Sequence, residues 1–316
     1  MHRSLEIAVS SAATDELLEK LSAIEDVISL SVHRGASIKP PGDVISVHAL
    51  NRGADAVMHA VASSPRGTSL SVATAELSSL NDPEHNAEID NDVDESLWEE
   101  METGVRHHGR ITANFVMLMA LGGALATIGL ISDRVPQAIC LIAASIIAPG
   151  FEPIAKIPLG LLLRHPHRWQ RGVKSTLVGY SVLIAASAAT FAVLMAAGEA
   201  THHELIENHH VKMLHHPHLA DLLQSGMAAV AGIVMITAYR RSVIAGPLAA
   251  LAIIPAAALI GTAAVCGDGQ FALAGLRRFA IDLVFIIVAG FLILGWKQLG
   301  AHRSRRLPFD ELKGAS

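Results

Sequence analysis

Long apolar segments after Arg110 constrain this chain more than any other feature of its sequence. Six of them are long enough to cross the ~30 Å hydrocarbon core of a bilayer at ~1.5 Å per helical residue. The sequence therefore predicts a polytopic α-helical membrane protein with about six transmembrane helices. The expected spans are at about 111–132, 135–163, 172–198, 220–240, 243–266 and 279–299.

The composition agrees with this prediction. Charged residues make up 17% of the 316 residues, against roughly 25% in an ordinary soluble protein. The net charge of −5 gives no basic field that would attract a polyanion, so we expect no nucleic-acid partner. Cys140 and Cys266 both lie in apolar surroundings and form no disulfide framework. The expected partners are the lipid bilayer and a small solute.

The first 80 residues have a different pattern, that of a small α+β domain. Strand and helix patterns alternate there in the order β-α-β-β-α-β, which is typical of a ferredoxin-like domain. This order resembles ACT-type sensor domains in topology only, so a structural role and a small-ligand site both remain open. Strands are expected at Ser4–Ser10, Ile28–Val32, Val44–Leu50 and Thr68–Leu77, and helices at Thr14–Val27, with Thr14 as the N-cap, and Ala54–Ala62.

Residues 81–108 are predicted to form an acidic connector, because Asn81 to Glu102 contains ten Asp and Glu and no Lys or Arg. The pattern at Glu95–Val105 is compatible with an interfacial helix that leads into the transmembrane domain at 111–300. Residues 301–316 form a basic tail.

Lysine and arginine in the short loops predict the orientation in the membrane. Six spans place the basic clusters that follow the second, fourth and sixth spans on one side, while the loop of residues 199–218 holds only Lys212. No signal-peptide pattern precedes the first domain. We therefore expect cytoplasmic N- and C-termini in the inner (cytoplasmic) membrane, with Arg277 and Arg278 as exceptions on the outer side.

Proline and glycine interrupt the second and fifth spans, which occupy corresponding positions if the six spans form two sets of three. Such a 3+3 arrangement inserts as an inverted repeat, and paired interruptions of this kind point to a transporter site. The alternative is a pair of kinked packing helices. The interrupting residues are Pro149, Gly150 and Pro153 in the second span, and Gly246, Pro247 and Pro255 in the fifth.

A few polar side chains fall inside these spans. Glu152 and Lys156 are four residues apart, so a helix places them on one face. Burying either alone is costly, which leaves a structural ion pair or a solute- or ion-binding site as alternatives. Asp282 is expected just inside the sixth span, paired with Arg278 or lining the same site, and Asn114 is a weaker candidate in the first span.

The stretch from Ala126 to Leu163 resembles domain-of-unknown-function family 389, a family of multi-spanning hydrophobic membrane proteins. The similar features are Gly129-Leu130, Ala148-Pro149, Pro153-Ile154 and Leu159-Gly160, with a second motif near Ile244–Ala256. This chain has only Pro255 where the family has a proline pair, Asp282 where many members have Asn, and Glu152 where a small residue is common. The resemblance covers about residues 111–300 and implies the architecture, but no established activity.

Seven histidines lie between His202 and His218. In helical form His203, Glu207 and His210 would share a face, and such ligands suit a divalent metal such as zinc. A solvated, pH-responsive outer loop is the alternative reading of this segment. No other cofactor is expected.

The sequence predicts a transporter or channel-like protein for a small polar or ionic solute, regulated or assembled by the N-terminal domain. The alternative is a membrane sensor or scaffold that transports nothing and whose soluble domain binds a ligand or partner. No GxSxG, HExxH, P-loop or paired catalytic carboxylates are present, so we expect no enzyme. Small-residue helix faces and the separate domain favour a homo-oligomer.

Overall fold

A computed structural model describes residues 2–65, 68–77, 79–92, 110–163, 166–238 and 245–300. The chain divides into two compact units, with the boundary between Glu99 and Glu100. The N-terminal unit precedes this boundary, and the helical unit comprises residues 100–299. The expected interfacial helix and the basic tail both lie outside the described residues.

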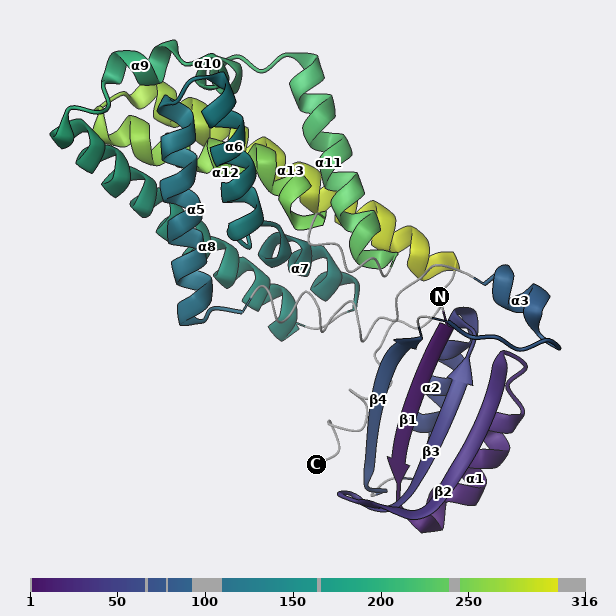
Figure 1. Ribbon diagram of the computed structural model, residues 1–316. Coiled ribbons are helices and arrows are strands. Elements are labelled where there is room, and N and C mark those ends of the chain that lie inside the picture. The colour runs from purple at the N-terminus through teal and green to yellow at the C-terminus, as the bar shows by residue number, and fades with distance from the viewer. Residues whose placement is uncertain are drawn as a thin grey trace. The chain divides into compact units, whose positions relative to one another are not determined.

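The N-terminal unit has the expected order of strands and helices and forms one four-stranded sheet (Figure 1). The sheet order is β2-β3-β1-β4 and every neighbouring pair is antiparallel. Ile7 in β1 lies opposite Ile45 in β3 and Val72 in β4. The elements are β1 (His2–Val9), α1 (Ser11–Ser22), β2 (Val27–Ile38), β3 (Pro41–Ala49), the 3-10 turn η1 (Asn51–Gly53), α2 (Ala54–Ala62), β4 (Leu70–Leu77) and the short helix α3 (Asn86–Asp90).

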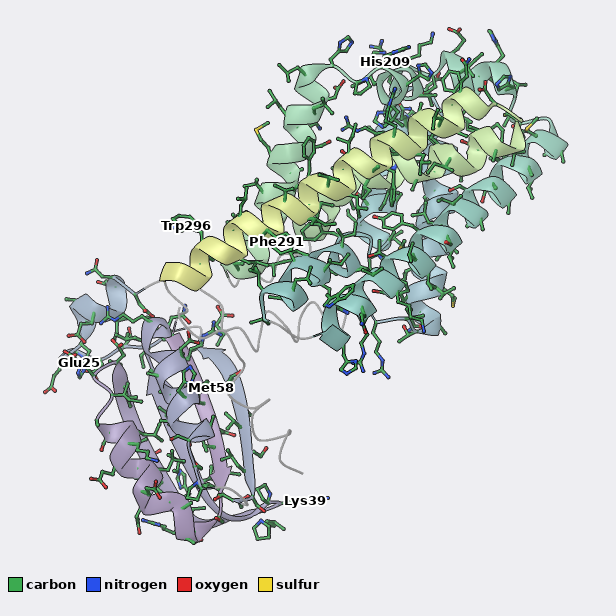
Figure 2. The ribbon with its side chains drawn as sticks, turned by 180° about the vertical axis from the view of Figure 1, so that it is seen from behind. Glu25, Lys39, Met58, His209, Phe291 and Trp296 are labelled. Carbon is green, nitrogen blue, oxygen red and sulfur yellow. The ribbon has the colours of Figure 1, made fainter. Side chains whose placement is uncertain are left out.

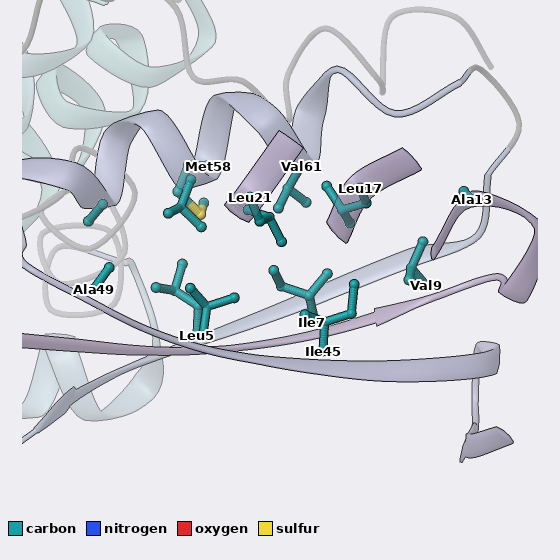
Figure 3. Packing of buried hydrophobic residues seen from close by; sticks show 13 residues of the cluster. Leu5, Ile7, Val9, Ala13, Leu17, Leu21, Ile45, Ala49, Met58 and Val61 are labelled. Atoms are coloured by element: carbon teal, nitrogen blue, oxygen red, sulfur yellow. The ribbon is translucent and has the colours of Figure 1, made fainter. Parts of the chain in front are cut away.

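Alternating apolar residues of β1 and β3 form the core of this unit with one face of α1 and of α2. A strand turns successive side chains to opposite faces, so every second residue points toward the helices. Fully burying each such aliphatic side chain contributes ~1.5–3 kcal/mol. Figure 3 shows the cluster, whose larger members are Leu5, Ile7, Val9, Leu17, Leu21, Ile45, Val47, Val57, Met58 and Val61.

Thr14 is not the N-cap of the first helix, which is a correction to the sequence prediction. The helix begins at Ser11, and the Thr14 hydroxyl instead donates to the Asp43 carboxylate over 2.8 Å. Ser11 donates to the same carboxylate over 2.9 Å, and the backbone N–H of Gly35 does so over 2.8 Å. The buried Asp43 thus joins the start of α1 to the end of the β2–β3 hairpin.

The helical unit contains nine described helices. Four of them, α5, α8, α11 and α13, are long and apolar enough to cross a membrane, and the bent pair α6–α7 counts as a fifth. The described apolar part of α12, Ala250–Val265, is shorter, so a count of six stays a prediction. Their bounds are α5 (Ala113–Ile131), α6 (Arg134–Ile147), α7 (Phe151–Leu162), α8 (Pro166–Ala197), α9 (His202–Glu207), α10 (His209–His215), α11 (Leu219–Thr237), α12 (Ala245–Val265) and α13 (Gly269–Gly300).

The last helix begins ten residues earlier than the sequence predicts, at Gly269 instead of residue 279. Asp268 accepts hydrogen bonds from the backbone N–H groups of Gln270 and Phe271 and so caps the helix start. The sequence prediction began after the charged pair Arg277 and Arg278, because charges inside a span are costly. As a consequence Asp282 lies near the middle of α13 and not at its beginning.

Helix α8 is central, because it packs against α5, α7 and α12. Glycines allow the backbones of α5 and α12 to approach that of α8 closely. A methyl group at residue 123 of α5 would lie 2.4 Å from the carbonyl oxygen of Leu183, and one at residue 261 of α12 would lie 2.3 Å from that of Ile184. The expected role of small residues at the helix interfaces is therefore present in the α5–α8 and α12–α8 contacts.

Helices α9 and α10 lie across one end of the bundle, which we name the cap end (Figure 1). Asn208, between the two helices, accepts a hydrogen bond from Gln137 and donates one to the carbonyl of Ser132 at the α5–α6 turn. His202 lies 3.2 Å from Asp268 at the α12–α13 turn. Figure 2 shows His209 at this end and Trp296 near the other. The three expected outer loops thus meet at one end of the unit.

Candidate functional site

The second expected span is broken where the sequence predicts the break. α6 ends at Ile147, α7 begins at Phe151, and their axes differ by 44°. Pro149 lies in the break, and Pro153 is in the first turn of α7, where a missing N–H removes no helical hydrogen bond. A break of this kind leaves the last carbonyls of one helix and the first amides of the next in need of partners from elsewhere.

Tyr180 of α8 supplies one such partner. Its hydroxyl donates to the carbonyl oxygen of Gly150 over 3.1 Å, and its ring meets Phe279 of α13 edge-on with centroids 4.7 Å apart. A methyl group at residue 150 would lie 2.8 Å from the Tyr180 hydroxyl oxygen, so the contact requires glycine there. The break is therefore attached to α8, and through Tyr180 it is close to α13.

Helix α7 is enclosed on several sides beyond the break. The Phe151 ring lies against Gly232 of α11, where a methyl group would come within 2.8 Å of it. Pro158 lies against Gly290 of α13, where the same distance would be 2.4 Å. The sequence gives no pattern that pairs these residues, because each glycine is more than seventy positions from its partner.

Glu152 and Lys156 lie one turn apart at the start of α7, as their spacing predicts. Glu152 is in the first helical turn, where the helix dipole favours a carboxylate, and Lys156 is only 9% exposed. Each of the two residues makes at least one polar or electrostatic interaction. Glu152 and Asp282 both lie within electrostatic range of Tyr180, whose hydroxyl is bonded to the Gly150 carbonyl.

Arg278 and Asp282 form a buried ion pair on α13. The Nε of Arg278 donates to Asp282 Oδ2 over 3.2 Å, and the two side chains are 6% and 3% exposed. A second guanidinium nitrogen, Nη2, donates to the Ser225 hydroxyl and, over 3.2 Å, to the Asp221 carbonyl of α11. This pairing balances the charge of Arg278 inside the helix bundle.

The fifth expected span is not broken in its middle, which corrects the prediction of a paired interruption. α12 runs without a break from Ala245 to Val265 with Pro255 inside it. Gly246 and Pro247 fall in its first turn, where proline needs no hydrogen-bond donor and its fixed φ suits the helix. Of the two corresponding spans, only the one built from α6 and α7 is bent beyond 40° at a break in the described residues.

Asn114 lies in the first turn of α5 and is exposed, so it is placed apart from the residues around Tyr180. Its position gives no support for a role at the break. The polar groups of α5 that do face a neighbour are smaller: Thr127 donates to the carbonyl of Gly123, and Ser187 of α8 donates to the same carbonyl.

The histidine segment does not form the expected metal site. Within the described residues, no three His, Cys, Asp or Glu side chains are grouped so that they could hold a metal ion. His203, Glu207 and His210 share no helix, because Asn208 adopts an extended conformation and separates α9 from α10. Glu207 instead pairs with Lys212 over 2.6 Å, which lowers the pKa of its carboxyl.

His210 is the least exposed of the three side chains, and its Nε2 atom is buried. Burial, and then the positive charge of Arg278, lower the pKa of His210 to about 4, so its ring is neutral near pH 7. Arg277 donates to the carbonyl of His215, the last residue of α10. The cap therefore contacts the start of α13 through two neighbouring arginines, one exposed and one buried.

The sequence pattern indicates neither the role of Tyr180 nor the ordered cap. Tyr180 lies in an apolar run with no motif around it, and only the folded contact with Gly150 reveals its role. The histidine-rich composition of the cap predicts a solvated or metal-binding loop, whereas the segment forms two short helices. The N-cap at Asn208, which accepts from the N–H of His210 over 2.9 Å, is the sequence signal that could have indicated a helix start.

The described part of the chain thus contains a bundle of long apolar helices, compatible with a multi-pass membrane protein, with one broken segment and a separate small α+β unit. Residues 145–288 match the family model described as "Domain of unknown function (DUF389)", which confirms the resemblance to that family over this part of the chain. The match runs from the end of α6 to within α13 and is narrower than the expected 111–300.

No curated protein and no solved structure matched the chain. The family match includes the α6–α7 break, Tyr180 and the Arg278–Asp282 pair, but neither α5 nor the N-terminal unit.

Proposed function

We propose that the chain is a multi-pass protein of the cytoplasmic membrane that carries a small polar or ionic solute past the α6–α7 break. The N-terminal unit would regulate or assemble it, and a homo-oligomer is the expected state. The observation that carries the proposal is the break itself: a bent, proline-containing segment with Glu152 in its first turn and Tyr180 bonded to its carbonyl.

The exposed faces of the helices support a membrane environment. On a helix of a water-soluble protein the exposed face is polar. Here α6 and α11 each carry an exposed row of large apolar residues three or four positions apart, although Arg134 of α6 and Gln224 of α11 are also exposed. The rows comprise Val135, Ile139, Ile142 and Ile146 on α6, and Leu219, Leu223, Met227, Val230 and Val234 on α11.

The distribution of polar groups supports a solute pathway. Irregular backbone at membrane depth is tolerated where it lines a cavity or is buried in protein. Buried ionisable residues within spans are costly and mark substrate or ion pathways by default. Glu152 and Asp282, which come from different helices, both lie within electrostatic range of Tyr180, and Tyr180 is bonded to the break. Transport would require one part of the bundle to move relative to the other around this point.

A flux measurement tests the proposal directly. The full chain is reconstituted in proteoliposomes, and light scattering follows their swelling in a panel of small solutes that includes chloride, phosphate and neutral amino acids. We expect uptake of at least one solute above empty vesicles, and its loss by about tenfold or more in Glu152→Gln and Lys156→Met. Glu204→Gln on the exposed cap helix α9 is the matched control and should leave the flux unchanged.

A membrane sensor or scaffold without transport is the second candidate. It is favoured by the close packing of Phe151 and Pro158 against glycines, which fills the space around α7 with protein. In that case no solute in the panel would enter the vesicles, and Glu152 would serve as a structural charge at a helix start.

A further inference from the structure

The buried pair on α13 has more polar capacity than its neighbours use. Arg278 and Asp282 are joined by one hydrogen bond of 3.2 Å, although a guanidinium and a carboxylate can form two parallel ones. Arg278 Nη1 and Asp282 Oδ1 are both buried and have no hydrogen-bond partner among the described residues. Buried polar atoms are rarely left in this state, so the pair calls for a role beyond packing.

Stability alone does not explain the pair. Replacing a buried ion pair by apolar side chains of similar volume is often neutral or stabilising. Within a hydrophobic helix an Arg and an Asp are both costly, and such residues mark ion or substrate pathways. Only one partner can change its charge at accessible pH, because a guanidinium stays protonated while a carboxylate accepts a proton.

We propose that Arg278 and Asp282 form a binding site for a small anion together with one proton, the proton on Asp282 and the anion on Arg278. In the empty site, the Asp282 carboxylate forms an ion pair with Arg278 and repels an anion. When a proton from water adds to the Asp282 carboxylate, the ion pair is lost and the guanidinium is left to hold the anion. One proton and one anion enter, no electrons move, and the loaded site keeps its net charge.

This charge balance suits passage through a bilayer. Moving a net charge through hydrocarbon is expensive, whereas an anion that travels with a proton adds no charge to the site. The inference rests on the proposed function and deepens it, because it names an anion as the solute and a proton as the coupling ion. It places the charge exchange on α13, and Tyr180 connects that helix to the α6–α7 break.

Other titratable groups face the pair and have to be distinguished from Asp282. His210 of α10 lies within electrostatic range of Arg278 and of Asp221 of α11, and Arg278 also donates to the backbone carbonyl of Asp221. Tyr180 of α8 is acted on by Asp282 and by Glu152 of α7. His210 is neutral near pH 7, and a proton on it would add a second positive charge beside Arg278. A variant at His210 therefore belongs in the test.

The test measures proton and anion binding to the purified full chain without any flux. Sodium formate, sodium chloride and sodium phosphate are titrated by calorimetry in buffers of different ionisation enthalpy, which gives the affinity and the protons taken up per anion. For at least one of these anions we expect about one proton per anion, and an affinity that rises toward about tenfold per unit fall in pH, the limit for one linked proton.

Four variants identify the residues that bind the proton and the anion. Asp282→Asn imitates the protonated carboxyl and should bind the anion without proton uptake at any pH. Arg278→Met should bind none. Arg277→Gln, at the exposed neighbour that contacts only the His215 carbonyl among its described hydrogen bonds, should behave as wild type. His210→Asn should retain the proton uptake.

Three results would overturn the inference: no binding of any of the three anions to wild type, binding to wild type without proton uptake, or unchanged uptake in Asp282→Asn. The wild-type result decides even if Arg278→Met does not fold. If anion binding takes up a proton but no solute enters the proteoliposomes, the anion site is retained and the transport proposal is rejected. The two proposals can therefore fail separately.

Discussion

At the scale of single residues, Asp43 makes the most specific prediction. Hydrogen bonds from the Gly35 N–H and then from the Thr14 hydroxyl lower the pKa of Asp43 from 3.8 to about 2. A carboxyl whose pKa is depressed on folding stabilises the fold above its unfolded pKa, and this contribution is lost as the pH falls through the folded value.

The hairpin end formed by β2 and β3 should therefore loosen between about pH 4 and about pH 2, the interval between the unfolded and folded pKa. Hydrogen exchange at the Gly35 amide is the measurement. Asp43→Asn should exchange faster than wild type near neutral pH and show no further acceleration in this acid interval. An acid acceleration of equal size in both proteins would assign the effect to another group.

Tyr180 allows a second residue-scale prediction. Tyr180→Phe removes the donor to Gly150 and little else, so the free energy of unfolding should fall by ~1 kcal/mol. Thermal unfolding of the purified protein measures this, and flux in proteoliposomes should fall as well because the break loses an attachment. Ser187→Ala is the control: it removes a buried hydroxyl that bonds to Gly123, away from the break. It should lower stability without changing flux.

At the scale of elements, the α5–α8 contact depends on one glycine. In Gly123→Ala the added methyl group would meet the Leu183 carbonyl, which belongs to the backbone and cannot rotate away. We expect a loss of ~1–3 kcal/mol, as for other overpacked interfaces. Gly226→Ala on α11 has open space around it and should be neutral or stabilise by up to ~1 kcal/mol. Equal melting temperatures for the two variants would contradict the packing described above.

The cap is a folded element, and Asn208 holds it. Its side chain accepts hydrogen bonds from the His210 N–H and from Gln137, and it donates to Ser132. Asn208→Ala should cost ~1 kcal/mol, as for loss of an N-cap, and should speed proteolytic cleavage within residues 199–218. His203→Ala, at an exposed position of α9, is the control and should leave the cleavage rate unchanged.

The elements that sequence predicts well are those whose signal is local. Alternation gives the strands, apolar length gives the long helices, and Pro149 with Gly150 gives the break. The prediction is wrong where a contact with a residue distant in sequence determines the local structure. The pattern predicts that Thr14 caps a helix, but its hydroxyl donates a hydrogen bond to Asp43, 29 positions away. The sequence pattern places the start of α13 after Arg278, because it does not show that Ser225 and the Asp221 carbonyl of α11 help to hold the buried guanidinium.

The candidate site was predictable only in part for the same reason. Glu152, Lys156 and Asp282 stand out because charges are rare in apolar segments. Tyr180 does not stand out, and its contact with Gly150 joins residues thirty positions apart. Pro247 shows the opposite error: proline ends or interrupts a helix in the middle but is harmless in the first turn, and the sequence does not fix where α12 begins.

At the scale of the whole molecule, the proposed orientation is testable by labelling. In intact cells a membrane-impermeant thiol reagent should modify Asp133→Cys, at the exposed α5–α6 turn of the cap end. It should modify Ser31→Cys in the N-terminal unit only after the membrane is permeabilised. Both are built without Cys140 and Cys266. Labelling of the two positions in the opposite order would invert the proposed topology.

If a polar solute reaches the α6–α7 break, position 152 must be accessible from water, and this accessibility can be measured. Glu152→Cys is placed in the cysteine-free chain in membrane vesicles and exposed to a small, charged, water-soluble thiol reagent. Asp133→Cys provides the accessible control, and Ser187→Cys, in the sealed α5–α8 contact, provides the inaccessible one. We expect Glu152→Cys to be modified at a rate between those of the two controls. Complete protection, equal to that of Ser187→Cys, would contradict it and leave a packed membrane scaffold.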